Sequence, residues 1–328
     1  MSQSEITSDQ SPSSYKKSRG YKSLYLYIKN RDLGEAVLLM QAKEFGKEHE
    51  RKIVLIPGNM MSWRQFENII PILEKDFHVI AVSTDGYDEK TEFTTTEKSA
   101  ESIERYIADN LDSHVDLVFG ESFGAATAGM MFNRQKVKID SIIMSGPQYM
   151  RLGVFTELIK RIIPKNQYRL TQKVKSGRKS GKMPLMLKLY TRADDENMLK
   201  MFDAMPDNIT LKTLQNCTDE ALRLYEVIDK FEPDQNAKVS IWHGAKEPNM
   251  KKALEKLKRA FPAVEDKPFE GMGHGDIIGH PEIMAAEIKK FMERYIPICW
   301  DRWNIKLEDN LTKDKQRFNE KVKSEYYF

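Results

Sequence analysis

The residues best suited to nucleophilic chemistry form the motif G-E-S-F-G at 120–124, with Ser122 at its centre. The motif directly follows a largely apolar run at 115–119 and leads into small residues, as a strand that turns sharply into a helix would. Glycines two positions before and after the serine let strand and helix approach closely. The pattern predicts a nucleophile elbow that presents Ser122 Oγ at the carboxyl end of a parallel strand. The alternative is a glycine-flanked turn with a solvated serine.

Around this motif, apolar runs alternate with helical patterns. The run at 53–56 is continuously apolar, as suits a strand buried on both faces, and further strands are expected at 78–82, 115–119, 139–144 and 239–242, with a short one near 267–269. Helices are expected between them, the last two at 249–261 and 281–295. This rhythm predicts an α/β fold with a mostly parallel central sheet and helices on both faces. Residues 33–45 are expected to form an antiparallel hairpin at the edge of that sheet.

Polar residues indicate where three helices begin. Ser62 with Gln65, and Thr94 with Glu97, have the spacing of capping boxes. Thr218 is the expected cap of a helix farther along the chain.

Between 148 and 236 the strand pattern stops and only helical patterns occur. A helical insertion late in a parallel sheet is most simply a lid over the site. Its charged residues are almost all basic from 151 to 192, whereas an acidic set follows from 194 to 220. The basic part could attract an anionic acyl substrate or a membrane surface. A solvated face, partly neutralised by the acidic part, is the favoured interpretation.

From about residue 33 to 296 the order of these features resembles the α/β-hydrolase superfamily, in which the nucleophile, acid and base follow as Ser, Asp or Glu, and His. The resemblance assigns the nucleophile to Ser122 and the base to His274, in the loop G-M-G-H-G at 271–275. It assigns the acid to Glu247, which follows a late strand and is one methylene longer than the usual aspartate. A serine hydroxyl needs such a base, and a carboxylate on the far ring nitrogen fixes the tautomer and stabilises the imidazolium.

The remaining histidines fit structural positions better. His49, His78 and His114 are expected in turns or at strand starts, His243 at a strand end and His280 at the start of the last helix. Among the carboxylates, Asp276 is too near His274 in sequence to reach its far nitrogen easily, and Asp85 is a weaker alternative acid.

The resemblance also implies an oxyanion hole made of two main-chain N–H groups. One belongs to Phe123, the residue after the nucleophile. The other would be that of Asn59, in the turn P-G-N at 57–59, where family members commonly carry His-Gly-X. Because both donors are main-chain groups, replacing the histidine removes no donor. The alternative is that 57–58 is merely a turn after a strand.

Composition places few limits on the partner. The chain has 328 residues, 40% of them hydrophobic, and a net charge of +3, which gives no reason to expect a nucleic-acid partner. Neither a membrane-spanning run nor a secretory signal is evident, and the two cysteines suggest no disulfide framework, so a cytoplasmic protein is expected. We expect a disordered N-terminus at 1–20, a core at 21–147 and 237–298, a lid at 148–236 and a tail at 299–328.

Together these features predict a serine hydrolase that cleaves a small-molecule carboxylic ester through an acyl-enzyme on Ser122. No cofactor and no metal site are expected. Acyl transfer or a lyase reaction on the same three residues is one alternative, since fold and residues do not determine the acceptor. A catalytically silent ligand-binding protein of the same fold is another, supported by Glu247 and Pro57.

Overall fold

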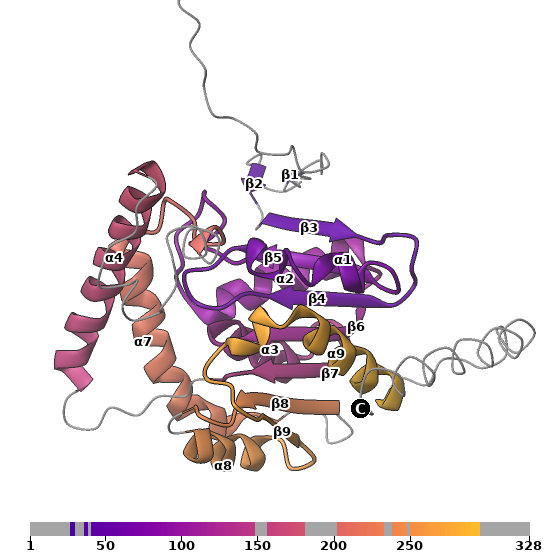
Figure 1. Ribbon diagram of the computed structural model, residues 1–328. Coiled ribbons are helices and arrows are strands. Elements are labelled where there is room, and N and C mark those ends of the chain that lie inside the picture. The colour runs from indigo at the N-terminus through magenta and orange to yellow at the C-terminus, as the bar shows by residue number, and fades with distance from the viewer. Residues whose placement is uncertain are drawn as a thin grey trace, which may run out of the picture.

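The computed structural model describes residues 27–29, 36–38, 41–147, 156–180, 202–232, 238–247 and 250–295. Its centre is a seven-stranded sheet in the order β3-β5-β4-β6-β7-β8-β9 (Figure 1). The strands are β3 (Gln41–Phe45), β4 (Lys52–Ile56), β5 (His78–Ser83), β6 (His114–Glu121), β7 (Lys138–Ser145), β8 (Lys238–Gly244) and β9 (Glu265–Phe269). Neighbouring strands are parallel except for β3, which runs antiparallel to β5. The predicted α/β fold with a mostly parallel sheet is confirmed.

Helices cover both faces of this sheet, which explains why central strands such as β4 and β5 are apolar along most of their length. On one face, α2 (Thr96–Asn110), α3 (Phe123–Arg134) and α8 (Met250–Ala260) pack against alternate strand residues such as Val54 and Ile56. On the other face, α1 (Ile70–Leu73) and α9 (Pro281–Tyr295) pack against Ile53 and Leu55. All four of these β4 side chains are inaccessible to solvent. The core is therefore divided by the sheet into two layers.

The strands of the predicted N-terminal hairpin at 33–45 do not pair with each other. β2 (Ala36–Leu38) pairs with β1 (Tyr27–Lys29) and not with the following segment. Residues 41–45 instead pair along their whole length with β5. That pairing buries Ala42 and Phe45 at the edge of the main sheet, which a local hairpin would not achieve.

Tertiary hydrogen bonds replace the predicted capping box of Ser62 and Gln65. Ser62 Oγ donates to Ala204 O at 2.8 Å, and Gln65 Oε1 accepts from the Gly58 N–H at 2.8 Å. Only a 3₁₀ turn, η1 (Trp63–Phe66), and the short α1 follow. Because both side chains bind distant main chain, neither is available to cap a helix.

Two other helix starts are displaced. The N-cap of α2 is Thr95, which accepts from the Lys98 N–H at 3.2 Å, one residue after the predicted Thr94. The helix predicted to begin at Thr218 is α7 (Leu211–Val227), and it begins after Thr210. Thr218 is buried inside α7, where its hydroxyl donates to the Leu214 carbonyl.

Between β7 and β8 in the chain lie α4 (Thr156–Ser180), α7 and the turn η3 (Ile228–Lys230). In Figure 1, α4 and α7 lie beyond the carboxyl ends of the parallel strands. Ion pairs join the basic and acidic parts of this insertion: Lys160 to Asp219 at 3.4 Å and Arg178 to Asp207 at 2.9 Å. These pairs favour the interpretation of a partly neutralised surface. Part of the basic segment, 181–192, lies outside the described residues, as do the predicted disordered N-terminus and the tail.

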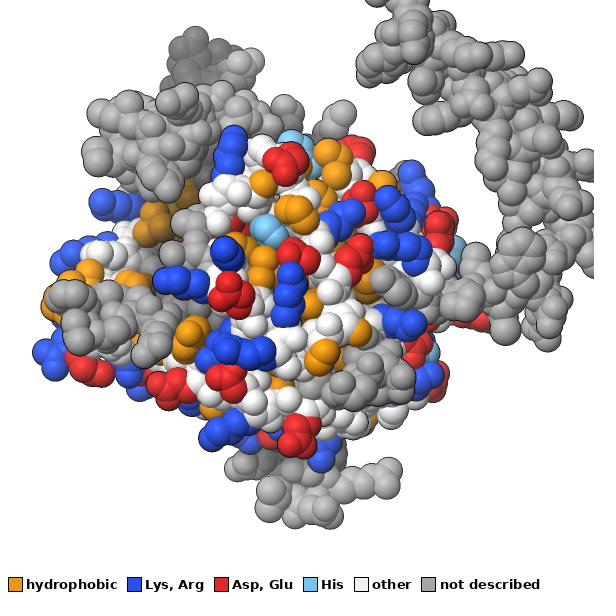
Figure 2. All heavy atoms as spheres, turned by 90° about the horizontal axis from the view of Figure 1, so that it is seen from below, with side chains coloured by type: hydrophobic (Ala, Val, Ile, Leu, Met, Phe, Trp, Pro, Cys, Tyr) orange, Lys and Arg blue, Asp and Glu red, His pale blue; other side chains and the backbone are white. Residues whose placement is uncertain are grey.

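Charges of both signs are interspersed on the face toward α8 and β9, as Figure 2 shows. This distribution agrees with the small net charge of the whole sequence. No helix within the described ranges is both long enough and apolar enough to cross a bilayer.

Candidate active site

Ser122 lies in the tight turn between β6 and α3. Its backbone has φ +51° and ψ −110°, a region that non-glycine residues rarely adopt. A Cβ on Gly120 would lie 2.3 Å from the Gly124 carbonyl oxygen, and one on Gly124 would lie 2.5 Å from that of Ile56. Both positions therefore require glycine, and the turn has the geometry predicted for a nucleophile elbow.

Three loops at the carboxyl ends of β6, β8 and β9 bring Ser122, His274 and Glu247 into one hydrogen-bonded chain. His274 Nε2 lies 3.0 Å from Ser122 Oγ, and His274 Nδ1 lies 2.6 Å from Glu247 Oε1. With the proton on Nδ1, the imidazole donates to the carboxylate and accepts from the hydroxyl. The structure thus brings together the three side chains that the sequence indicated; their catalytic roles stay predictions.

Main-chain contacts join the loop of Glu247 to the loop of His274. The Lys246 N–H donates to the Met272 carbonyl at 2.9 Å, and the Glu247 N–H closes a turn on Gly244 O at 3.0 Å. A Cβ on Gly244 would lie 2.4 Å from Met272 O, so only glycine permits this approach. The Glu247 side chain is only 3% exposed. The longer acid is therefore held rigidly against the imidazole.

The charges around His274 favour its protonated form. Burial lowers the pKa of the imidazole, whereas the Glu247 hydrogen bond and the negative charges of Glu121, Glu247 and Asp276 raise it. Because the raising effects together exceed the effect of burial, the pKa of His274 lies above its usual value. The same charges would stabilise the imidazolium that forms when Ser122 loses its proton.

The turn at 57–59 lies beside Ser122, as the predicted oxyanion hole requires. A Cβ on Gly58 would lie 3.4 Å from Ser122 Cβ. The Gly58 N–H is bound by Gln65, and the Tyr87 hydroxyl donates to Asn59 Oδ1. Sequence reasoning missed Gln65 and Tyr87 as supports of this turn, because nothing local marks their long-range bonds.

Phe123 begins α3, where main-chain N–H groups have no partner within the helix. That position suits the predicted donation to an oxyanion. The oxyanion roles of Phe123 and Asn59 remain predictions.

The alternative acids lie elsewhere or serve the loop. Asp85 accepts from Ser99 Oγ at 3.4 Å, and burial raises the pKa of its carboxyl to about 6. Asp276 accepts from the Gly273 N–H at 2.7 Å, so it shapes the histidine loop. His243 pairs with Asp266 at 3.1 Å. None of the three carboxylates takes the place of Glu247 on His274 Nδ1.

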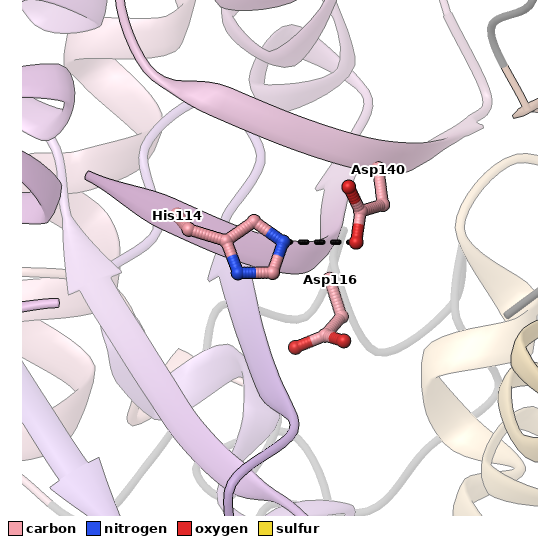
Figure 3. Close-up of side chains that lie close together, drawn as sticks. All are labelled: His114, Asp116 and Asp140. Atoms are coloured by element: carbon pink, nitrogen blue, oxygen red, sulfur yellow. Dashed lines mark hydrogen bonds and ion pairs between the residues drawn. The ribbon is translucent and has the colours of Figure 1, made fainter. Parts of the chain in front are cut away.

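A second histidine–carboxylate cluster lies at the opposite end of β6 (Figure 3). The ligand atoms of His114, Asp116 and Asp140 lie within 4.8 Å of one another, a spacing that could hold a metal ion. However, His114 Nε2 already lies 2.8 Å from Asp140 Oδ2, and Lys138 pairs with Asp140 at 3.2 Å.

Asp116 in that cluster is likewise satisfied, because its Oδ2 accepts from the Lys52 N–H at 2.7 Å. Arg51 also places a positive charge near Asp116. Because protein groups already compensate both carboxylates, we interpret the cluster as a connection between the starts of β4, β6 and β7. The sequence indicated no metal site and did not foresee this grouping.

Comparison with known families agrees with the fold. Residues 52–281 match the sequence model of a family described as the alpha/beta hydrolase fold. The chain belongs to this α/β-hydrolase family. The match spans the elbow and the positions of Glu247 and His274. A search of curated proteins finds no significant match.

Many solved structures share the fold at low sequence identity. An α/β-hydrolase family protein from Desulfitobacterium hafniense is 19% identical, with a TM-score of 0.58 over 76% of this chain and 99% of its own. A structure reported with carboxylesterases of Nitrososphaera gargenis is 17% identical, with a TM-score of 0.61 over 82% and 98%. The non-heme bromoperoxidase BpoC of Mycobacterium tuberculosis is also 17% identical, with a TM-score of 0.60 over 80% and 98%. At such identities these likenesses show the fold alone.

Proposed function

We propose that this α/β-hydrolase is a serine hydrolase that cleaves a small-molecule carboxylic ester through an acyl-enzyme on Ser122. The observation that carries the proposal is the hydrogen-bonded chain from Ser122 through His274 to Glu247. The strained backbone of Ser122 supports it, because strain at a single polar residue is typical of functional sites.

In this mechanism Ser122 Oγ attacks the ester carbonyl while His274 Nε2 takes the hydroxyl proton. The Phe123 and Asn59 N–H groups stabilise the oxyanion, each worth about 3 kcal/mol in the transition state. His274 then gives the proton to the departing alcohol. A water molecule, deprotonated by His274, releases the acid and restores the serine. Glu247 holds the imidazole and its positive charge throughout.

An apolar cluster beside the elbow suits an apolar acyl group. Phe123 stacks edge-on against Phe93, with ring centroids 5.4 Å apart. The cluster joins the β-sheet loops to the helical insertion; its buried members are Tyr87, Phe93, Val174, Phe202, Met205, Ile209, Leu214 and Cys217. We infer that α4 and α7 act as the lid over this site. The carboxylesterases among the similar structures accord with an ester substrate.

The test is stoichiometric labelling by a fluorophosphonate, followed by mapping of the modified residue. Labelling of Ser122 in the wild type and its loss in Ser122→Ala are expected, whereas the exposed serine variant Ser176→Ala should label normally. A panel of esters of increasing acyl length, assayed with and without an added alcohol, would separate hydrolysis from acyl transfer. A folded wild type that does not label would contradict the proposal and favour a silent binding protein.

A further inference from the structure

A second carboxyl group lies at the candidate active site. Glu121 is the last residue of β6, directly before Ser122, and its residue is 1% exposed. Neither carboxyl oxygen forms a hydrogen bond of good geometry with the described residues. Its register partner Ser145 in β7 places a hydroxyl nearby. A buried carboxyl without such bonds is costly, which favours a functional reason for its presence.

Two glycines place this carboxyl beside His274. A Cβ on Gly146 would lie 2.9 Å from both Cε1 and Nδ1 of His274 and 3.5 Å from Glu121 Oε1. A Cβ on Gly275, the residue after His274, would also lie 3.5 Å from Glu121 Oε1. Both glycines have positive φ, +54° and +74°. The backbone around His274 therefore leaves space that a side chain would close, and Glu121 and the imidazole both border it.

We propose that Glu121 is a positioning residue that acts through His274, sharing with Glu247 the positive charge that the imidazole acquires. This inference rests on the proposed function. Glu247 binds Nδ1 directly, whereas Glu121 acts through space from the end of β6. Glu121 is buried whereas the His274 side chain is 34% exposed, so solvent screens this interaction only in part. The chain would thus support its general base with two carboxylates from different strands.

The electrostatics agree with this arrangement. Burial is the main cause that raises the pKa of Glu121 to about 7. The negative charge of Glu247 also raises this pKa, whereas Ser145 and His274 lower it. Glu121 is therefore expected to titrate near pH 7, and its support for the imidazolium would grow as the pH rises through 7. The charged groups facing His274 are Glu121, Glu247 and Asp276; those facing Glu121 are His274 and Glu247.

The experiment compares the wild type with Glu121→Gln, which keeps the shape and removes the charge. The His274 pKa is measured by NMR, with the signal assigned from its loss in His274→Gln, alongside the pH dependence of kcat. In Glu121→Gln we expect the His274 pKa and the acid limb of kcat to fall by about one unit. At pH 8 kcat should fall about tenfold, with KM changed less than about twofold. Glu121→Asp should restore part of the shift.

Asp85→Asn is the matched control, because Asp85 is a half-buried carboxyl with a raised pKa that hydrogen-bonds Ser99 and does not bind His274. It should move neither the His274 titration nor the acid limb. An unchanged His274 pKa in Glu121→Gln would overturn the inference. If that variant does not fold, the wild-type titration decides: two coupled steps are expected, and a single step would contradict the coupling.

Failure of the proposed function gives a different result. A wild type that does not label with fluorophosphonate removes the hydrolase mechanism, but the NMR titration still reports whether Glu121 and His274 are coupled. If the wild type labels but the His274 pKa is the same in Glu121→Gln, only the inference about Glu121 is contradicted.

Discussion

Strand β6 carries a histidine–carboxylate cluster at each end, and the two clusters differ in what satisfies their polar groups. At the amino end, Asp116 accepts from the main chain and Asp140 binds both Lys138 and His114. At the carboxyl end, Glu247 binds His274 with one oxygen, while its other oxygen lacks a hydrogen-bond partner among the described residues.

This difference shows why the same residue types have different roles in the two clusters. At the amino end, cations and main-chain N–H groups compensate the charge of the carboxylates. His114 is held by Asp140 there, and within the described residues no nucleophile hydrogen-bonds to its ring. At the carboxyl end the negative charge acts on His274, whose other nitrogen faces Ser122. Positive φ occurs at both ends, at Ser122 and at Asp112 and Ser113 just before His114. The close contacts of Gly120, Gly124 and Gly146 lie around Ser122 and His274 at the carboxyl end. Among the described residues, buried carboxylate oxygens without a hydrogen-bond partner distinguish the candidate active site from the structural cluster.

The largest expected effect comes from exchanging the two histidines for glutamine one at a time. His274→Gln should lower kcat at least about a thousandfold, because it removes the base that lies against Ser122 Oγ. His114→Gln should leave kcat within about twofold. The measurement is steady-state ester hydrolysis, with fluorophosphonate labelling as a second readout. Equal losses in both variants would mean that the two clusters do not differ as the structure indicates.

A smaller effect is expected from the carboxylates that orient each ring. Glu247→Gln should lower kcat about a hundredfold, since the amide neither fixes the tautomer nor stabilises the imidazolium. Asp140→Asn, the same change at the amino end, should alter stability by about 1 kcal/mol and leave kcat unchanged. Urea unfolding and ester hydrolysis on both variants measure this. A fully active Glu247→Gln would show that another group acts as the acid.

The third prediction concerns stability, and it follows from the raised pKa of Glu121. Because the folded-state pKa of about 7 exceeds that of an unfolded glutamic acid, Glu121 costs no stability at low pH and increasingly destabilises the fold as the pH rises to 7. Glu121→Gln should therefore gain stability relative to the wild type between about pH 4.5 and pH 8, by about 3 kcal/mol. Denaturant unfolding at both pH values measures the gain. A constant difference would show that the carboxyl is not perturbed.

The smallest expected effect tests the space around His274. In Gly146→Ala the new methyl group would meet the imidazole at 2.9 Å in a backbone of positive φ. We expect kcat to fall about tenfold and stability to fall by about 1 kcal/mol. Gly279→Ala is the control, because nothing lies within 4 Å of its added Cβ. An unchanged kcat in Gly146→Ala would mean that the loop of His274 moves to accommodate the methyl group.

Much of the architecture follows from local pattern. Runs rich in apolar residues predicted the strands β4 to β8, because a strand covered by helices on both faces buries most of its side chains. The motif at 120–124 predicted the elbow because only glycine permits the contacts that Gly120 and Gly124 make. The capping box at Ser62 was predicted wrongly, because its hydroxyl binds the distant Ala204 carbonyl. The helix start at Thr218 was also wrong, because Thr218 lies inside α7 and its hydroxyl binds the Leu214 carbonyl one turn earlier.

The sequence by itself determined the order of the chemical residues along the chain and the family pattern that they match. Tertiary structure alone decided their surroundings: that Tyr87 holds Asn59, and that Glu121 borders the imidazole. The physical reason is that these contacts join the ends of different strands. Their geometry depends on the register and twist of the whole sheet, which no single segment encodes.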